Sequence, residues 1–555
     1  MLREAFQIRD QIQNEAILKD WLQGLREKAE EYRGTEIAEW TMQDYERFYR
    51  DGNRLAFEEK YFDRRGRLTT YALMVFVYRD KDFLPLLEEV IEKICDEPTW
   101  VLPAHLPEGS TEGRTFIDLF AAETGSALSE IKYLLADVLS DAIKARMHEE
   151  VRERVVEPYV NHGSEFWWFT ITTNWSAVCS GCAALSCIYD GTAEEAERAI
   201  ELAGESMKYF LSGFSEEGVC MEGYSYWTYG FGSFLTYADA AYKFTDGKVN
   251  YFADERVHKI ARFMNGGILR TGTPVAFADA SAKEGVSLAY AYYLSAKYSD
   301  IGLADGGWAE YADDVCYRWV RLVRTFVWVP YYKNQAHEET KQQGVSYYPD
   351  AGWYIKKTPS YILCAKGGHN AEPHNHNDVA SFYIDDYSKQ VLNDLGSGEY
   401  TRDYFAEKRY EFFVCGSQGH NVPIIDGKLQ EPGADRKATI LEVSDNVLRM
   451  EAAKAYAMDE LKSFVRCLEM TDDEIVLTDH FEGEIHEIRE RFITSEAVVV
   501  TDTGCKIGKV TLDAGFRPEI GTVVYAAHDG ADREVKTIDF VLDEKEFQMR
   551  ICFEE

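Results

Sequence analysis

The sequence predicts an α+β protein in which a helical N-terminal half is followed by a half built of antiparallel strands. Apolar residues recur with a helical period from Leu2 to about Val329, and from about Gly344 short β-branched or aromatic runs alternate with turns. The length of 555 residues exceeds one ordinary core. We therefore expect a helical domain at 1–335 and a strand domain at 345–555, joined by a linker near 331–344.

The helical half is predicted to consist of paired antiparallel helices. The clearest helix spans 192–213, where Thr192 and Glu195 form a capping box and Gly213 ends the pattern. Its apolar face comprises Ala196, Ile200, Ala203, Met207 and Phe210. The run 71–97, interrupted at 80–82, predicts a helical hairpin, and amphipathic runs continue over 116–156.

The C-terminal half contains short runs that are typical of strands and are separated by Asp, Gly and Thr turns. The strands are predicted at 351–357, 361–366, 379–384, 389–393, 464–470, 474–479 and 497–502. Their number and spacing favour an antiparallel β-sandwich.

Composition limits the possible partners and location of the protein. The net charge of −36 excludes a general nucleic-acid binder, because no basic stripe is present. An acidic substrate stays possible, since charges beyond a Debye length of about 8 to 10 Å are screened. No apolar run is long enough to span a membrane, and the N-terminus lacks the apolar segment of a signal peptide. We expect a soluble, cytoplasmic protein.

The 11 cysteines are scattered and odd in number, which favours a reducing compartment over a disulfide framework. Cys179 and Cys182 form a Cys-x-x-Cys pair within an Ala- and Ser-rich helical run. We interpret the pair as small buried residues at a helix contact, with redox chemistry as the alternative.

Histidine and carboxylate residues gather around the predicted strands 379–384 and 389–393. If the preceding chain is extended, His374 and His376 point to the same side. Two imidazoles and one carboxylate form a common zinc set, so His376, Asp394 and His420 are predicted metal ligands. Zinc is the first candidate and manganese the second. The alternative is a polar turn whose imidazoles bond only to backbone.

The motifs His-Asn-His-Asn-Asp (374–378) and Asn-Asp-Leu-Gly-Ser-Gly-Glu-Tyr (393–400), with Gly-His-Asn (419–421) before a strand, resemble the heparinase II/III family of polysaccharide lyases. This resemblance implies an N-terminal (α/α) toroid and a C-terminal β-sandwich. It also implies an acidic, uronate-containing polysaccharide or oligosaccharide substrate, cleaved by β-elimination.

The resemblance extends into the helical half. Thr-Thr-Asn-Trp (172–175) is similar to the family's helix start, in which an asparagine faces the uronate carboxylate. Asn174 matches that residue, although it also suits a helix N-cap. The family commonly has a histidine next, where this chain has Trp175. Trp175 is therefore a candidate for substrate binding instead.

The segment from Glu217 to Gly230 is similar to the family's segment with the catalytic tyrosine. Tyr229 fits that role better than Tyr226, which is assigned to substrate binding or aromatic packing. Glu222, and His105 in a Trp-x-x-Pro-Ala-His segment, are further candidates for the wall of the substrate site. The alternative for His105 is a loop histidine bonded to backbone.

The resemblance implies a division of chemical roles. Asn174 would donate to the uronate carboxylate and stabilise charge in the transition state. His374 would remove the C5 proton, because its reference pKa of about 6.5 suits neutral pH. Tyr229 would protonate the leaving O4, and for one sugar epimer would also take the C5 proton. The metal would have a mainly structural role.

Three other functions fit the sequence. The substrate could be alginate or another polyuronate rather than a glycosaminoglycan. The metal set could serve a metal-dependent hydrolase or oxygenase on the strand domain. Trp175 is the best support for a glycan-binding protein without turnover.

Overall fold

The computed structural model describes residues 2–110, 113–270, 272–280, 285–304, 306–338 and 344–554. It divides into two compact units. The helical unit comprises Met1–Phe214, Tyr226–Asn265 and Glu284–Glu339, and the sheet unit comprises Ser215–Ser225, Gly266–Lys283 and Thr340–Glu555. Two segments from the helical half of the sequence thus belong to the sheet unit.

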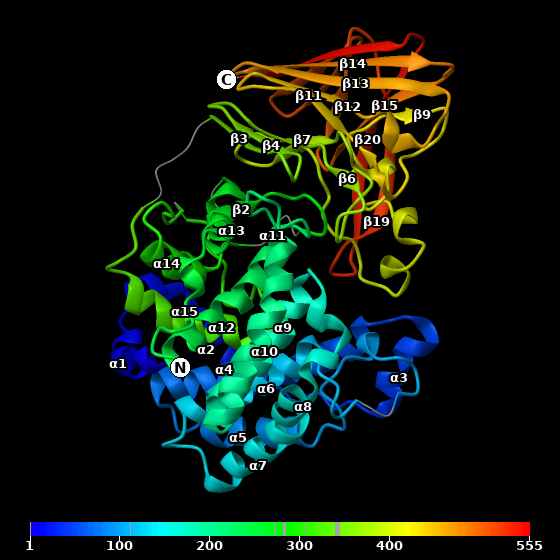
Figure 1. Ribbon diagram of the computed structural model, residues 1–555. Coiled ribbons are helices and arrows are strands. Elements are labelled where there is room, and N and C mark those ends of the chain that lie inside the picture. Colours follow the sequence, from blue (N-terminus) through cyan, green and yellow to red (C-terminus); the bar gives the residue numbers. More distant parts are fainter. Residues whose placement is uncertain are drawn as a thin grey trace. The chain divides into compact units, whose positions relative to one another are not determined.

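The order of helices before strands is confirmed, and Figure 1 shows the helices in blue to green and most strands in green to red. The α-helices are α1 (Arg3–Ile12), α2 (Lys19–Arg33), α3 (Met42–Asp51), α4 (Leu55–Tyr78), α5 (Leu84–Cys95), α6 (Leu119–Leu134), α7 (Asp141–Val151), α8 (Glu157–His162), α9 (Asn174–Asp190), α10 (Ala193–Ser212), α11 (Tyr224–Tyr226), α12 (Gly232–Phe244), α13 (Glu255–Gly266), α14 (Leu288–Lys297) and α15 (Trp319–Tyr332). Two π-helical segments, η3 (Arg152–Val156) and η6 (Trp227–Phe231), interrupt this series.

Local signals place several helices as expected. The side chain of Thr192 accepts a hydrogen bond from the backbone N–H of Glu195, and the carboxylate of Glu195 accepts one from the backbone N–H of Thr192. These two bonds complete the predicted capping box of α10. The predicted helical hairpin consists of α4 and α5, and the helix is interrupted between Arg79 and Phe83. The expected linker 331–344 begins inside α15, and its residues 339–343 lie outside the described residues.

Helix α9 is buried along most of its length. It packs against α6, α10 and α12, and its Ala, Ser, Gly and Cys side chains permit this close approach. Cys179 and Cys182 are buried and free, as expected for a helix contact. Burial raises the pKa of both thiols, which makes them poor nucleophiles.

The strands form antiparallel sheets with one shared hydrophobic core. The largest sheet has the order β11 (Thr439–Val443), β12 (Val447–Glu451), β13 (Leu461–Met470), β14 (Glu474–Gly483), β21 (Glu546–Phe553), β18 (Val510–Asp513), β17 (Gly504–Ile507), β16 (Val498–Val500). A second sheet has the order β19 (Glu519–Ala526), β20 (Asp532–Leu542), β15 (Ile488–Thr494), β9 (Ile424–Ile425). A third has the order β3 (Gly344–Tyr348), β4 (Trp353–Lys357), β5 (Ile362–Lys366), β7 (Phe382–Asp385), β8 (Gln390–Leu392). Two small pairs join β1 (Ile268–Arg270) to β2 (Thr273–Pro274) and β6 (His369–Asn370) to β10 (Gly433–Lys437).

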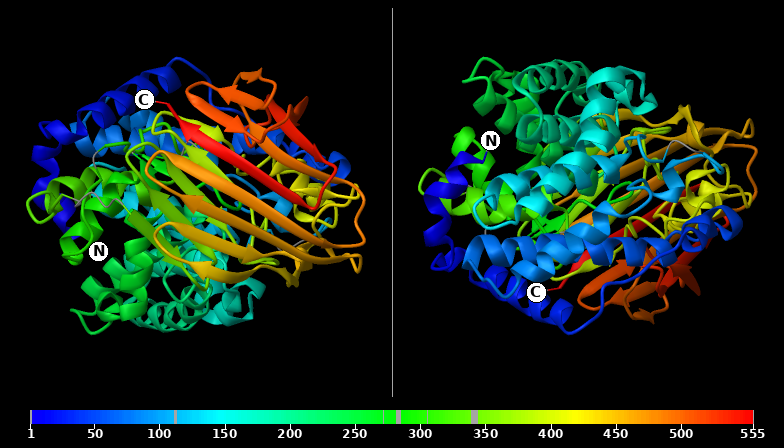
Figure 2. Two further views of the ribbon diagram at one scale, coloured as in Figure 1. Left: turned by 90° about the horizontal axis from the view of Figure 1, so that it is seen from above. Right: turned by 90° about the horizontal axis from the view of Figure 1, so that it is seen from below.

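The long strands of the largest sheet lie side by side, in yellow, orange and red in Figure 2. Their register pairs Leu468 of β13 with Leu477 of β14. The buried Arg466 of β13 is paired with Asp479 and Glu490, and it also donates to the carbonyls of Ala380 and Asn421. The core of the sheet unit therefore fixes two loops that lead to the candidate site.

Among the described helices, none combines the length and apolar character that a membrane span requires.

Candidate functional site

The first group of candidate residues lies at the start of α9 in the helical unit. Thr173 takes the N-cap position without a side-chain capping bond, and Asn174 is the first helical residue, so the N-cap alternative considered for Asn174 is wrong. Asn174 is buried, and Gly230 lies directly against it: a Cβ added at Gly230 would approach the Asn174 Cβ to 3.0 Å. The glycine after Tyr229 thus permits the segment η6 to approach the start of α9 closely.

Tyr229 lies in the π-helical segment η6, a distortion that is frequent at functional sites. Its ring packs under the guanidinium of Arg318, with 4.3 Å between Cζ and the ring centroid. Its buried hydroxyl finds no hydrogen-bond partner among the described residues. Burial and the nearby charge of Glu123 raise the pKa of Tyr229 well above its usual value. Tyr229 is therefore a neutral acid at rest.

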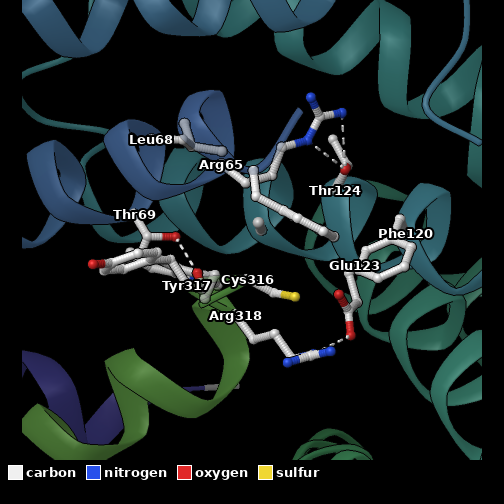
Figure 3. Close-up of a pocket in the computed structure, with 12 residues that line it drawn as sticks. Arg65, Leu68, Thr69, Phe120, Glu123, Thr124, Cys316, Tyr317 and Arg318 are labelled. Atoms are coloured by element: carbon white, nitrogen blue, oxygen red, sulfur yellow. Dashed lines mark hydrogen bonds and ion pairs between the residues drawn. The ribbon is translucent and has the colours of Figure 1, made fainter. Parts of the chain in front are cut away.

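Two carboxylates hold Arg318 in place. Its Nε donates to Oε1 of Glu123 at 3.3 Å, and its Nη1 donates to Oδ1 of Asp314 at 2.7 Å. Figure 3 shows the guanidinium of Arg318 joined to the carboxylate of Glu123 by a dashed line, and both residues line a small cavity. Burial raises the pKa of Glu123 to about 7, against the opposing effect of Arg318. Glu123 therefore exchanges protons in the neutral range.

His105 is held by a carboxylate rather than by backbone, which contradicts the alternative considered for it. Its Nδ1 lies 2.7 Å from Oδ2 of the buried Asp118, whose Oδ1 caps α6. The His105 ring meets the Trp175 ring edge-on at 4.7 Å between centroids, and Trp175 contacts Trp167 at 4.8 Å. Trp167 is 54% exposed, so these rings present an accessible aromatic surface.

The second group lies in the sheet unit and centres on His374. The distance from its Nδ1 to Oδ2 of Asp279 is 2.7 Å, and Nε2 lies 3.5 Å from Oε2 of Glu222. The carboxyl pKa of Asp279 lies well below its usual range despite complete burial, because His374 and His376 bond to it. An ionised Asp279 accepts a proton-bearing Nδ1, so that Nε2 carries the lone pair in neutral His374. Asp279 thus fixes the orientation of the His374 ring, with Nε2 turned towards the carboxylate of Glu222.

Asp279 also binds residues that the sequence did not single out. Its carboxylate accepts from the hydroxyl of Tyr404 at 2.6 Å and from Nη2 of Arg409 at 3.0 Å, besides its contact with Nε2 of His376 at 3.0 Å. The condition for strand geometry at His374 is not met, since its φ is +58° and the segment forms turns. Asp279, rather than strand geometry, brings the two imidazoles together.

The three predicted metal ligands converge in the sheet unit. Ligand atoms of His376, Asp394 and His420 lie within 4.8 Å of one another, and all three residues are buried. His376 Nδ1, His420 Nδ1 and Asp394 Oδ2 have no hydrogen-bond partner among the described residues. Three orphaned buried ligand atoms that converge fit a divalent cation.

The remaining imidazole nitrogens of this set have partners of the kind that metal-bound histidines use. Nε2 of His420 donates to the carbonyl of Val414 at 2.9 Å, and Nε2 of His376 faces Asp279. A second group, Asp279, His376 and Cys415, also has the spacing of a metal site. Asp279 already bonds to His374, His376, Tyr404 and Arg409, so the first group is the better candidate for a metal site.

Some of the site residues could be recognised in the sequence and others could not. Motifs marked Asn174, Tyr229, His374 and the three ligands, whereas Glu123, Arg318, Asp279, Tyr404 and Arg409 were missed. In the sequence, nothing but residue type distinguished these five, and acidic, basic and tyrosine residues are common in this chain. Tyr226 is half-buried on α11, and no particular arrangement distinguishes it as a substrate-binding residue.

Comparisons with known proteins find no matching family model and no matching curated protein. Solved structures do match. Heparinase III has a TM-score of 0.61 at 13% identity, covering 88% of this chain and 76% of that one. A heparan sulfate lyase mutant of Pedobacter heparinus has 0.59 at 12%, covering 96% and 83%. The chondroitin AC lyase of Streptomyces coelicolor has 0.53 at 10%, covering 96% and 78%. The chain therefore has the fold of heparinase-like polysaccharide lyases.

Proposed function

We propose that this protein is a polysaccharide or oligosaccharide lyase that cleaves uronate-containing glycans by β-elimination, with a glycosaminoglycan-like substrate. The main observation behind this proposal is that each expected proton-transfer group has a fixed partner. The ring of Tyr229 packs under the guanidinium of Arg318, and His374 is bonded to Asp279. The lyase fold supports the same proposal. We propose with it that the helical unit is an (α/α) toroid and the sheet unit a β-sandwich.

Each residue has one role in the proposed reaction. The amide of Asn174 donates to the uronate carboxylate, which lowers the cost of charge that develops at C5. Nε2 of His374 takes the C5 proton, and the carboxylate of Glu222 stabilises the imidazolium that forms. The hydroxyl of Tyr229 gives its proton to O4 as the C4–O4 bond breaks. His105, Trp175 and Tyr226 are proposed to contact neighbouring sugars.

A divalent cation, zinc first and manganese second, is proposed at His376, Asp394 and His420. When bound it supplies a fixed charge that orders the loops around His374. The burial of all three ligands disfavours a metal-dependent hydrolase, because such an enzyme keeps an open position for water and substrate.

The direct test is to incubate the protein with a panel of uronate polymers, including heparan sulfate, chondroitin, hyaluronan and alginate. A lyase produces a C4–C5 double bond with ultraviolet absorbance, whereas a hydrolase produces reducing ends without it. Absence of new absorbance with every polymer would exclude the proposal for those substrates.

Tyr229→Phe separates a lyase from a binding protein. It removes the acid but keeps the ring under Arg318, so we expect turnover to fall by at least about 10³-fold while oligosaccharide affinity stays within a few fold. Tyr209→Phe, at a 42% exposed position of α10, is the matched control. Steady-state kinetics and calorimetric titration measure the two effects. Unchanged turnover in Tyr229→Phe would refute its role.

A further inference from the structure

The reaction proposed above leaves Tyr229 short of one proton. The C5 proton ends on His374 while Tyr229 has given its own proton to O4, so each turnover produces an imidazolium and a phenolate. The imidazolium can release its proton to solvent. Tyr229 must recover a proton before the next substrate reacts, and this requirement holds only if the proposed function is correct.

The surroundings of Tyr229 leave few sources for that proton. Its hydroxyl oxygen is buried and has no hydrogen-bond partner in the described part of the chain. Arg318 covers the ring and stays charged, since its neighbouring carboxylates hold its pKa above its usual value. Glu123 is the carboxyl that acts on Tyr229: it raises the pKa of the Tyr229 hydroxyl, and Tyr229 in turn lowers the pKa of the Glu123 carboxyl.

Glu123 can hold a proton at neutral pH. It lies on α6 with a side chain only 12% exposed. The groups that act on it are Arg318, Asp314, Asp118 and Tyr229, and Arg65 and Cys316 line the same cavity. Burial outweighs the ion pair with Arg318 and raises the carboxyl pKa to about 7. Protonated and ionised Glu123 therefore coexist at neutral pH.

A small cavity gives Glu123 a place for water. It has a volume of about 20 Å³ and is lined by Glu123, Arg65, Thr124, Cys316 and Arg318, together with apolar residues (Figure 3). That volume suits roughly one water molecule. The carboxylate of Glu123, the Thr124 hydroxyl and the guanidinium groups are the two to four polar partners that a buried water needs.

We propose that Glu123 returns a proton to Tyr229 after each elimination, and that a water molecule in the adjoining cavity reloads Glu123. In the first step the O–H bond of the Glu123 carboxylic acid breaks and a new O–H bond forms on the Tyr229 phenolate. In the second step the carboxylate takes a proton from hydronium that reaches it through the cavity water. His374 releases one proton to solvent, so the cycle balances.

The proposal predicts an alkaline loss of turnover. Return of the proton needs protonated Glu123, so kcat falls as pH rises through the pKa of about 7. Glu123→Gln keeps the size of the side chain but carries no exchangeable acid proton. We expect its kcat to fall by about 10²-fold, its KM to stay within about two-fold, and the alkaline limb to disappear.

Two further variants keep the test decisive. Asp314→Asn removes the other carboxylate from Arg318 but leaves Glu123, so we expect a modest loss of kcat with the limb retained. Glu123→Asp keeps an acid at a shorter reach, and it should recover at least a tenth of the wild-type kcat with a limb. This variant decides the question if Glu123→Gln does not fold.

The proposal is overturned if Glu123→Gln keeps the alkaline limb, or if it raises KM with kcat unchanged. It is also overturned if Asp314→Asn loses the limb, because the position of Arg318 would then explain the effect. Wild-type protein that yields no unsaturated product would instead overturn the proposed function, and the two failures are therefore distinguishable.

Discussion

The two units hold their candidate proton-transfer groups by opposite means. In the helical unit the buried hydroxyl of Tyr229 has no hydrogen-bond partner within the described ranges, and a carboxyl group with a raised pKa lies nearby. In the sheet unit Asp279 accepts from His374, His376, Tyr404 and Arg409. The tyrosine lies beside a carboxyl group that titrates near neutral pH, whereas the histidine is bonded to a carboxylate that stays ionised.

This difference has an energetic meaning. A buried polar atom without partners costs roughly 1–3 kcal/mol, which a protein retains where function needs it. A saturated network costs little once formed but loses much when its centre is removed. We therefore expect substitutions in the sheet unit to act mainly on stability and metal binding, and those around Glu123 to act mainly on proton chemistry.

The largest expected effect is that of Asp279→Ala. It leaves the buried guanidinium of Arg409 and the imidazole nitrogens of His374 and His376 without their shared acceptor. Removing one partner from a buried charged network costs about 3–5 kcal/mol, so the free energy of unfolding in urea should fall by that amount. Turnover should be lost with it.

The matched control for this substitution is Asp435→Ala, whose side chain is 78% exposed and faces only Arg436 at 3.6 Å. Its unfolding free energy should change by no more than about 0.5 kcal/mol. Equal unfolding curves for Asp279→Ala and wild type would remove the distinction between the two units.

Metal binding is the next test. After growth with zinc and dialysis, His420→Ala should lose most of the bound divalent metal, because one of three ligands is gone. His480→Ala, at a 52% exposed position, should retain it. Elemental analysis by mass spectrometry measures the content per chain.

Cys415→Ser separates the two possible metal groups. If His376, Asp394 and His420 hold the ion, this variant keeps its metal content. Loss of metal in Cys415→Ser with retention in His420→Ala would move the site to the group around Asp279.

The sequence predicted those parts of the fold that depend on local signals. The capping box at Thr192 and the strand pair around the 385–388 turn were visible because neighbouring residues determine them. The assignment of 215–225 and 266–283 to the sheet unit depends on contacts far along the chain. The π-helical segment at Tyr229 likewise has no periodic signal in the sequence.

The same reasoning explains which site residues were found. His376, Asp394 and His420 lie within a short stretch, and histidine is rare enough for its clustering to stand out. Glu123 and Arg318 are 195 positions apart, and Asp279 precedes His374 by 95. Acidic and basic residues are abundant in this chain, so only the folded backbone reveals these pairs.

The smallest expected effect concerns stability around Glu123. Its folded-state pKa of about 7 exceeds the ordinary value, so ionisation opposes folding, and this cost grows as pH rises through 7. Glu123→Gln carries no charge, so above neutral pH its free energy of unfolding should exceed that of wild type by about 1–2 kcal/mol. The gain is no larger because the variant also loses the ion pair with Arg318. Below about pH 5 the difference should vanish.

Glu195 provides the control of opposite sign within the same unit. Its bond from Arg152 lowers its carboxyl pKa to about 2, so it stabilises the fold at neutral pH and loses that contribution as pH falls from about 4 towards 2. Glu195→Gln should therefore destabilise at neutral pH by about 1 kcal/mol, given the partial exposure of this pair. Urea unfolding between about pH 5 and pH 8 resolves the trend expected of Glu123→Gln and the loss of stability expected of Glu195→Gln at neutral pH. If Glu123→Gln destabilises at pH 8 as Glu195→Gln does, then Glu123 is an ordinary ion-pair residue and the helical unit holds no group set apart for proton exchange.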